Sequence, residues 1–202
     1  MTKKILITGA NGQLGHEMRN ALKGNNRFEC IFTDVAELDI CNTEAVKQTM
    51  ANNHIDYIVN CAAYTQVDKA EDNAELCKKI NTDAVENLAR AAADYGARMI
   101  HISTDYVFNG RGYRPYTEDM VPDPQSVYGS TKLEGEKILT DICPESIIIR
   151  TAWLYSPYGN NFVKTMLHLG EEREELSVVA DQIGTPTCAA DLAQAILVIL
   201  QA

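Results

Sequence analysis

The sequence has 202 residues, which is enough for one domain with a well-buried core and no need of disulfides. Hydrophobic residues make up 46% of it and charged residues 23%, values that exclude a disordered, fibrous or low-complexity chain. The net charge of −10 argues against a nucleic-acid partner, because such proteins carry the clustered Lys and Arg that this sequence lacks.

The first apolar stretch follows Met1-Thr-Lys-Lys4 directly and breaks at Gly9, which is too short for a signal peptide or a membrane span. The six cysteines form no C-x-x-C pair and have no His partner at metal spacing. We therefore interpret them as reduced and structural, assign no metal-binding residue, and expect a cytoplasmic protein without membrane contact.

A glycine-rich turn follows the first predicted strand, Lys3 to Thr8, which is apolar and β-branched as a buried parallel strand should be. The turn reads Gly9-Ala-Asn-Gly12-Gln-Leu-Gly15 and opens a helix predicted from about Gln13 to Lys23. Glycines at this spacing let backbone amides approach a pyrophosphate at the positive end of the helix dipole. The pattern predicts dinucleotide binding.

An acidic residue ends the second predicted strand, which runs from Phe28 to Thr33. In dinucleotide-binding folds an acid about 20 residues beyond the glycines accepts hydrogen bonds from the adenosine ribose, and Asp34 fits that place. Its carboxylate would repel a 2′-phosphate and so favours NAD, although Arg27 or nearby Lys residues could modify this. Asp39-Ile40 follows in a loop within reach of the adenine.

The middle of the chain alternates helices and strands: a helix from Thr43 to Asn53, a strand from Ile55 to Cys61, and a helix from Asn73 to Tyr95 capped by Gly96. The small residues of Ala62-Ala63-Tyr64 would let the chain pass close to a flat cofactor. The long helix presents one apolar face, made of Leu76, Ile80, Ala84, Leu88 and Ala91. Asn81, in its middle, either has a hydrogen-bonding task or is simply exposed.

Polar residues end the fourth predicted strand, Arg98 to Ser103, where a parallel sheet binds its ligands. Thr104 and Asp105 follow it directly. The next predicted helix carries Tyr128 and Lys132 one turn apart, on the same face. A neighbouring cation lowers the pKa of a phenol, so this pair is a candidate proton-transfer device.

The last third begins with a fifth strand, Ser146 to Arg150, followed by polar and aromatic residues that include Trp153. A short helix from Asn161 to Gly170, a strand from Leu176 to Val179 and a final helix from Ala189 to Leu200 are expected after it. The alternation predicts an α/β fold with a Rossmann-like, doubly wound parallel sheet. We assign residues 1–150 to a dinucleotide-binding domain and residues 151–202 to the last sheet elements and the start of a substrate lobe.

Several separate blocks resemble the extended short-chain dehydrogenase/reductase superfamily and, more narrowly, the dTDP-4-dehydrorhamnose reductases. They are Ser103-Thr-Asp-Tyr-Val-Phe108, Tyr128-Gly-Ser-Thr-Lys-Leu-Glu-Gly-Glu136, Arg150-Thr-Ala-Trp153, Gly159-Asn-Asn-Phe162, Val67-Asp-Lys-Ala-Glu71 and Asp181-Gln-Ile-Gly-Thr-Pro-Thr187. The blocks agree in order and spacing over nearly the whole chain.

The resemblance implies reduction, with NADH or NADPH, of the 4-keto group of a dTDP-4-dehydro-6-deoxy sugar to give dTDP-L-rhamnose for polysaccharide synthesis. Tyr128 would protonate the sugar oxygen, Lys132 would lower the pKa of Tyr128 and bind the nicotinamide ribose, and Thr104 would hydrogen-bond the reacting oxygen. Asp105 and Trp153 would contact the sugar nucleotide, with an ordinary core aromatic as the alternative for Trp153. The implied cofactor contacts are Gly9, Gly12, Gln13, Leu14, Asp34, Asp39, Ile40, Ala62, Ala63, Tyr64, Tyr128 and Lys132.

Members of that family continue beyond the length of this chain, so an incomplete substrate-binding lobe is expected. A homodimer is a possible assembly, and magnesium at its contact is expected only through that further segment. Two alternatives remain: a nucleotide-sugar epimerase or dehydratase of the same superfamily, and a non-catalytic regulatory subunit that binds a dinucleotide without turnover.

Overall fold

The structure, a computed structural model, describes residues 2–202. Within these residues one parallel sheet of five strands forms the centre: β1 (Lys3–Thr8), β2 (Phe28–Phe32), β3 (Tyr57–Asn60), β4 (Arg98–Thr104) and β5 (Ile147–Thr151). Their order is β2-β1-β3-β4-β5, so the direction of winding reverses between β1 and β3. This confirms the predicted Rossmann-like sheet, in which ligands bind outside the carboxyl ends of the strands at such a reversal.

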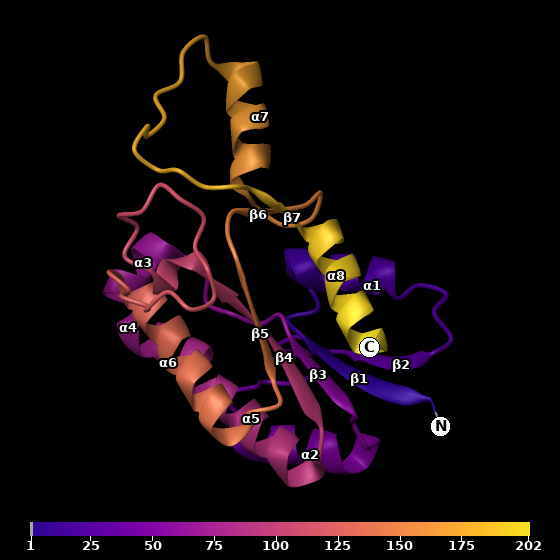
Figure 1. The fold of residues 1–202 in the computed structure, drawn as a ribbon. Helices are drawn as coiled ribbons and strands as arrows, with labels where there is room; N and C mark the ends of the chain where they lie inside the picture. Colours follow the sequence, from indigo (N-terminus) through magenta and orange to yellow (C-terminus); the bar gives the residue numbers. More distant parts are fainter. Residues whose placement is uncertain (1) are drawn as a thin grey trace.

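Helices cover both faces of the sheet (Figure 1). On one face lie α2 (Thr43–Asn53), α5 (Ala84–Tyr95) and α6 (Val127–Ile142), and on the other α1 (Gln13–Ala21) and α8 (Ala189–Gln201). The strand β1 supplies both cores by alternation, since Leu6 packs towards α2 and α5 while Ile5 and Ile7 pack towards α1 and α8. Burial on both sides explains why the three central residues of this strand, Ile5, Leu6 and Ile7, are all apolar.

The helix predicted from Asn73 to Tyr95 is divided in the structure. It consists of α4 (Ala74–Lys78), a π-helical turn η1 (Lys79–Asp83) and α5, which ends as expected at Gly96 in a left-handed conformation. The wider π turn shifts the face that meets the sheet, so Leu76 is 48% exposed and its predicted place on the apolar face is wrong. The same shift buries Asn81. A preceding short helix, α3 (Val67–Asp72), was not predicted.

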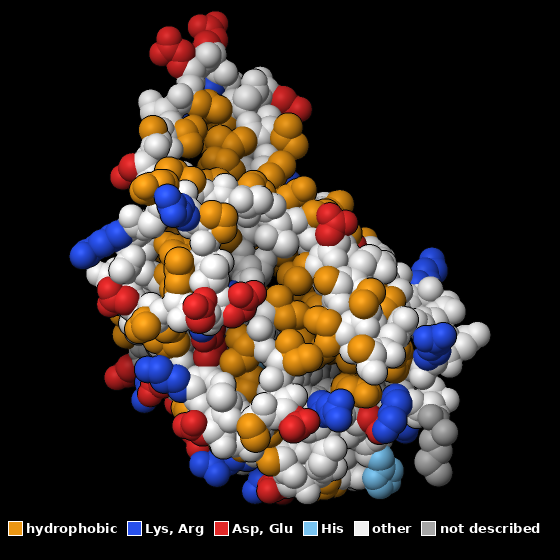
Figure 2. All heavy atoms as spheres, viewed as in Figure 1, with side chains coloured by type: hydrophobic (Ala, Val, Ile, Leu, Met, Phe, Trp, Pro, Cys, Tyr) orange, Lys and Arg blue, Asp and Glu red, His pale blue; other side chains and the backbone are white. Residues whose placement is uncertain are grey.

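A projecting segment follows β5 (Figure 1). It contains β6 (Leu154–Tyr155), α7 (Phe162–Glu172) and β7 (Thr187–Cys188), which pairs in parallel with β6 before α8 returns to the sheet beside α1. The strand predicted from Leu176 to Val179 is wrong, because these residues are irregular and exposed and have no strand beside them to pair with. Figure 2 shows apolar side chains gathered on this projection. The exposed large hydrophobic residues of the segment include Leu167, Val178 and Ile183.

Candidate active site

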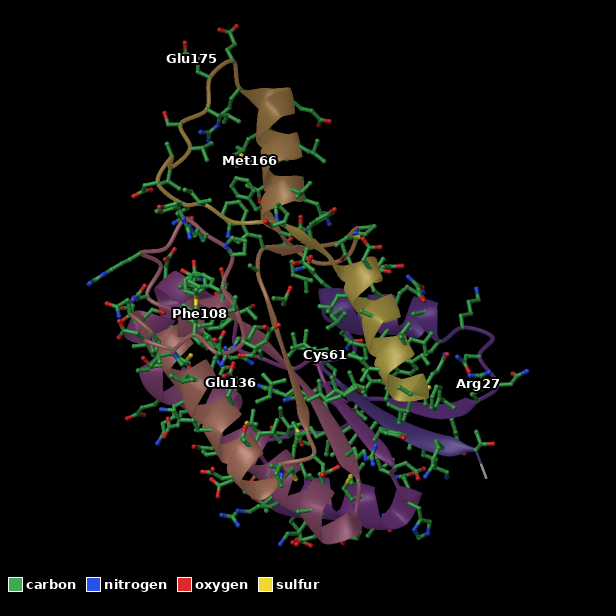
Figure 3. The ribbon with its side chains drawn as sticks, viewed as in Figure 1. Arg27, Cys61, Phe108, Glu136, Met166 and Glu175 are labelled. Carbon is green, nitrogen blue, oxygen red and sulfur yellow. The ribbon has the colours of Figure 1, made fainter. Side chains whose placement is uncertain are left out.

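A cavity of about 700 Å³ lies outside the carboxyl ends of the strands. Its walls come from the β1–α1 turn, the end of β3, the end of β4, the first turns of α6 and the projecting segment. Figure 3 marks Cys61, one of the lining residues, just beyond β3 near the middle of the molecule. Nine residues predicted for the site line this cavity: Gly12, Gln13, Leu14, Ala63, Thr104, Asp105, Tyr128, Lys132 and Trp153.

The glycine turn fits a dinucleotide. Gly9 has a φ of +62°, and a side chain there would come within 2.7 Å of the backbone of Ala62. Gly12 is the N-cap of α1 and supplies no side-chain cap, so the first amides of the helix remain available to an anion. On the far wall, the hydroxyls of Ser103 and Thr151 are buried and have no hydrogen-bond partner among residues 2–202. Close backbone approach and unpaired donors are features that a polar, phosphate-bearing ligand would use.

Asp34, which follows β2, binds the backbone of the same glycine turn. The Asp34 carboxylate accepts hydrogen bonds from the backbone N–H groups of Asn11 and Val35, both at 2.9 Å. It therefore lies beside the glycine turn, where an adenosine ribose is expected. Further along the loop, Asp39 is exposed and accepts a hydrogen bond from the Cys41 N–H, whereas the Ile40 side chain is buried in the core.

An amide clamp holds the segment after β3. The Asn81 side chain accepts a hydrogen bond from the Tyr64 N–H at 2.9 Å and donates one to the Tyr64 carbonyl at 3.1 Å. Its Nδ2 also lies 3.4 Å from Thr131 Oγ1 on α6. Of the two alternatives left open for Asn81, the structure shows the hydrogen-bonding one. The clamp ties the Ala62-Ala63-Tyr64 segment to the helix that carries Tyr128 and Lys132.

Capping fixes where α6 begins. The Ser126 hydroxyl accepts a hydrogen bond from the Gly129 N–H at 3.1 Å, and the Glu71 carboxylate accepts one from the Val127 N–H at 2.9 Å. These side chains satisfy first-turn amides, and the negative charge of Glu71 lies at the positive end of the helix. They place Tyr128 on the first turn, facing the cavity.

The Tyr128 phenol is buried beside the end of β4. Burial raises the pKa of Tyr128 to about 12, with the Thr104 side chain opposing that rise. The sequence had suggested that Lys132 lowers the pKa of this phenol, but the net direction is upward because desolvation is the largest cause. Next to it, burial raises the pKa of Asp105 while a hydrogen bond from Thr104 opposes the rise. The phenol is thus held in its protonated form near neutral pH, as a proton donor requires.

The Lys132 amino group is enclosed more completely, since the residue is 1% exposed. It donates a hydrogen bond to the Ile102 carbonyl at 2.7 Å and lies 3.2 Å from Nε2 of His101. Burial lowers the pKa of Lys132 to about 8, and the Glu136 carboxylate opposes that change. Both ends of the predicted pair therefore meet the same cavity, although burial rather than mutual attraction sets their pKa values.

The projecting segment completes the cavity through contacts with the glycine turn. The Asn161 amide donates to Gln13 Oε1 at 2.9 Å, and the Gln13 amide lies 3.4 Å from the Leu154 carbonyl. Trp153 is 38% exposed and packs against Gly184 and, with ring centroids 5.9 Å apart, against Phe162. Trp153 is therefore a wall of the cavity and not a core aromatic.

Sequence reasoning assigned no role to several polar residues of the site. Asn161 and Thr151 were noticed only within motifs, and His101 was given no role. Position marks only Thr151, which ends β5, because His101 lies in the middle of β4 and Asn161 is the N-cap of α7.

Three negative observations apply to residues 2–202. No cluster of three His, Cys, Asp or Glu side chains there has the arrangement of a metal site. All six cysteines are free. None of the helices in this range is both long enough and apolar enough to cross a membrane.

The sheet order, the glycine turn and the Tyr128/Lys132 pair define a dinucleotide-binding protein of the short-chain dehydrogenase/reductase type. Residues 3–202 match the family model described as RmlD substrate binding domain, and the chain belongs to that family. It is 48% identical over 193 residues to the dTDP-4-dehydrorhamnose reductase of Escherichia coli K12, an alignment that covers 94% of this chain and 64% of the relative.

Two solved structures agree. A dTDP-4-dehydrorhamnose reductase from Clostridium acetobutylicum is 52% identical, with a TM-score of 0.95 and coverage of 98% of this chain and 70% of that one. The enzyme from Bacillus anthracis in complex with NADP is 44% identical, with a TM-score of 0.96 and coverage of 100% and 72%. The chain spans about two thirds of the length of the curated relatives that it matches.

Proposed function

We propose that the protein reduces the 4-keto group of dTDP-4-dehydrorhamnose to give dTDP-L-rhamnose, with NADH or NADPH as the reductant. The observation that carries this proposal is the single cavity shared by the glycine turn, Thr104, Tyr128 and Lys132. The names of the relatives support the substrate. A relative with NADP in its solved complex supports a nicotinamide cofactor.

The dinucleotide would lie on Gly9, Gly12, Gln13 and Leu14, with its ribose at Asp34 and its adenine near Asp39 and Ile40. Ala62, Ala63 and Tyr64 would border its nicotinamide half, which Lys132 would hold through the ribose. When bound, the reduced nicotinamide supplies a hydride to the sugar carbonyl carbon.

The protein's own residues would handle the proton. Tyr128, protonated at neutral pH, donates its phenolic proton to the oxygen on which negative charge develops. The Thr104 hydroxyl hydrogen-bonds the same oxygen and orients it towards the phenol. A correctly placed general acid accelerates such a step by roughly 10²- to 10⁴-fold. Asp105 and Trp153 would contact the sugar nucleotide from the outer wall.

We also propose how the chain is divided into functional parts. Residues 1–150 would bind the dinucleotide, while residues 151–202 would add the last sheet elements and the first part of the sugar-nucleotide lobe. We also propose a cytoplasmic location, which the free cysteines support, and a homodimer, which the apolar side chains exposed on α7 support. No metal is assigned within residues 1–202, and a magnesium-linked contact would need acidic residues from a further segment.

The test is cofactor oxidation, followed by the absorbance of the reduced nicotinamide, with the 4-keto dTDP-sugar and either NADH or NADPH. The 202-residue chain should turn over, and the Tyr128→Phe variant should lose activity while it keeps its affinity for the cofactor. Cofactor binding without turnover in both proteins would overturn the reductase assignment for this chain and favour a binding subunit. Enzyme-bound cofactor that is never consumed while the sugar is converted would point to an epimerase or dehydratase.

A further inference from the structure

A chain of buried polar side chains crosses the sheet beneath the cavity. It runs through Thr8 at the end of β1, Asn60 at the end of β3, His101 in β4 and Lys132 on α6, and none of these residues is more than 1% exposed. Thr8 Oγ1 lies 2.6 Å from Asn60 Oδ1, and Asn60 Nδ2 lies 3.0 Å from His101 Nδ1. His101 Nε2 lies 3.2 Å from Lys132 Nζ. Each contact joins a neighbouring element, so the four side chains form one continuous line.

The backbone fixes the direction of these hydrogen bonds. Ala62 N–H can only donate, and it points at Asn60 Oδ1 at 3.2 Å. With Oδ1 turned to Ala62, the NH₂ group of Asn60 faces His101, so Nδ1 of the ring must accept. A neutral imidazole that accepts at Nδ1 carries its proton on Nε2 and donates it there. The Lys132 nitrogen accepts this hydrogen bond, so it must be an uncharged amine with a free lone pair.

The charges around the amino group allow that state. From α6, Glu136 favours the cation, but its carboxylate is already paired with Arg150 through two hydrogen bonds of 3.0 and 2.7 Å. From α4, the Cys77 thiol also favours the cation, and Tyr128 contributes an uncharged phenol. From β4, His101 is itself neutral, because burial and the Lys132 charge lower the pKa of His101 well below its ordinary value.

We propose that His101 is a positioning residue for Lys132, which holds the lysine nitrogen through Nε2 and changes tautomer with the charge of that nitrogen. When Lys132 is an amine, His101 carries its proton on Nε2, as the hydrogen bonds of the structure require. When Lys132 is an ammonium group, Nε2 must accept and the ring proton moves to Nδ1. The imidazole remains neutral in both states.

The change of the His101 tautomer also affects the Ala62-Ala63-Tyr64 segment, which is proposed to border the cofactor. A proton on Nδ1 needs an acceptor, so the Asn60 amide must rotate to present Oδ1 to the ring. That rotation takes the acceptor away from the Ala62 N–H. The charge of Lys132 is therefore coupled to the backbone next to Ala63, which lines the cavity. The inference rests on the proposed function, in which Lys132 holds the nicotinamide ribose.

The first test is an NMR titration of the wild-type chain, residues 1–202, labelled with ¹⁵N-histidine and ¹³C-lysine, from about pH 6 to about pH 10. The His101 ring signals, assigned with a His101→Gln variant, should change from the Nδ1–H to the Nε2–H pattern as pH rises. The midpoint should equal that of the Lys132 side chain. A ring that becomes imidazolium within this range, or that keeps one tautomer while Lys132 titrates, overturns the proposal.

The second test fixes the tautomer by substitution. In Asn60→Asp, carboxylate oxygens can accept from Thr8, from Ala62 N–H and from Nδ1–H of His101 at once, so Nε2 becomes a permanent acceptor. The Lys132 midpoint should then rise by roughly one unit or more, because the ammonium form gains its partner. Asn53→Asp adds the same charge at the end of α2, away from the cavity, and should leave the midpoint unchanged. A folded Asn60→Asp protein without an upward shift contradicts the proposal.

These readouts separate the inference from the proposed function, since neither needs substrate or turnover. A chain that fails to reduce the dTDP-sugar but shows the coupled titration would lose the reductase assignment and keep the role of His101. An active chain whose His101 tautomer never changes would keep the assignment and lose this inference. Should Asn60→Asp not fold, the wild-type titration decides alone.

Discussion

Tyr128 and Lys132 lie one turn apart on α6, and burial moves their pKa values in opposite directions. The pKa of Tyr128 is raised to about 12, and that of Lys132 is lowered to about 8. In both residues the neutral form is favoured, because removing an ion from water costs more than the surrounding charges return. The phenol therefore keeps its proton through the neutral range, directly beside the cavity, whereas the amino group loses its proton only as pH rises through about 8.

The buried lysine should make stability depend on pH. The pKa of Lys132 is lower in the folded chain than the unfolded value of 10.5, so its contribution is full above the unfolded pKa and is lost as pH falls through about 8. The free energy of unfolding of the wild type, relative to Lys132→Met, should rise from pH 8 to pH 10.5 by up to about 3 kcal/mol. Urea unfolding across this range measures it, and parallel curves for the two proteins would contradict it.

Two helical glycines offer a matched comparison. A methyl group on Gly15 in α1 would overlap the Gly9 carbonyl and the backbone of Ala10, whereas one on Gly170 in α7 would meet no atom. Gly15→Ala should lower the free energy of unfolding by about 3 kcal/mol, at the upper end of overpacking costs, and should weaken dinucleotide binding. Gly170→Ala should be neutral or stabilising by up to about 1 kcal/mol. Thermal unfolding and cofactor titration test both, and equal effects would refute the close approach at Gly15.

The amide clamp predicts a specific effect of Asn81→Asp. The variant keeps an acceptor for the Tyr64 N–H but turns an oxygen towards the Tyr64 carbonyl, in place of a donor. A buried group without its partner costs about 1–3 kcal/mol, and more when charged, so the variant should lose about 2 kcal/mol or more. Its cofactor affinity should fall as well, because the Ala62-Ala63-Tyr64 segment is released. Urea unfolding and cofactor titration measure the two losses.

The same Asn→Asp change at position 53 of α2 is the control for Asn81→Asp. There the lost hydrogen bond runs to the Thr49 carbonyl within the last turn of the helix. It should change stability by less than about 1 kcal/mol. An equal loss in both proteins would show that the effect is one of charge and not of the clamp.

The partly buried ion pair between Arg150 and Glu136 should contribute more to the free energy of unfolding than an exposed ion pair does. Arg150 binds Glu136 through two hydrogen bonds, and its guanidinium carbon lies 5.0 Å from the centre of the Phe108 ring. Phe108 and Glu136 are labelled in Figure 3. Arg150→Met leaves the buried carboxylate unpaired, at a cost of about 3 kcal/mol. Arg90→Met breaks the exposed pair with Glu86 and should cost about 0.5 kcal/mol or less.

A double variant separates the charge from the packing in that comparison. Glu136→Gln added to Arg150→Met removes the unpaired carboxylate, so it should restore much of the stability lost in the single variant. Unfolding free energies of the four proteins form a double-mutant cycle. If the double variant is no more stable than Arg150→Met alone, the loss comes from packing against Phe108.

Periodic patterns in the sequence correctly predicted those helices and strands whose bounds depend on residues close to one another in the chain. The strand Lys3–Thr8 and the helix Thr43–Asn53 have the predicted bounds, because uninterrupted apolar runs and capping residues act locally. Leu76 was misplaced because a π turn changes the helical period, which no residue pattern announced. The strand expected at Leu176–Val179 failed because β-propensity needs a pairing partner, and the fold provides none there.

The sequence by itself determined the order of elements, the glycine turn and the Tyr128/Lys132 pair, because each depends on residues a few positions apart. Only the tertiary structure decided which groups surround that pair. His101 is 31 positions from Lys132, and Asn60 is a further 41 from His101, so their contacts exist only once β3, β4 and α6 have packed. Packing also removed the water, and desolvation then set the pKa values in a direction that the spacing of Tyr128 and Lys132 had not suggested.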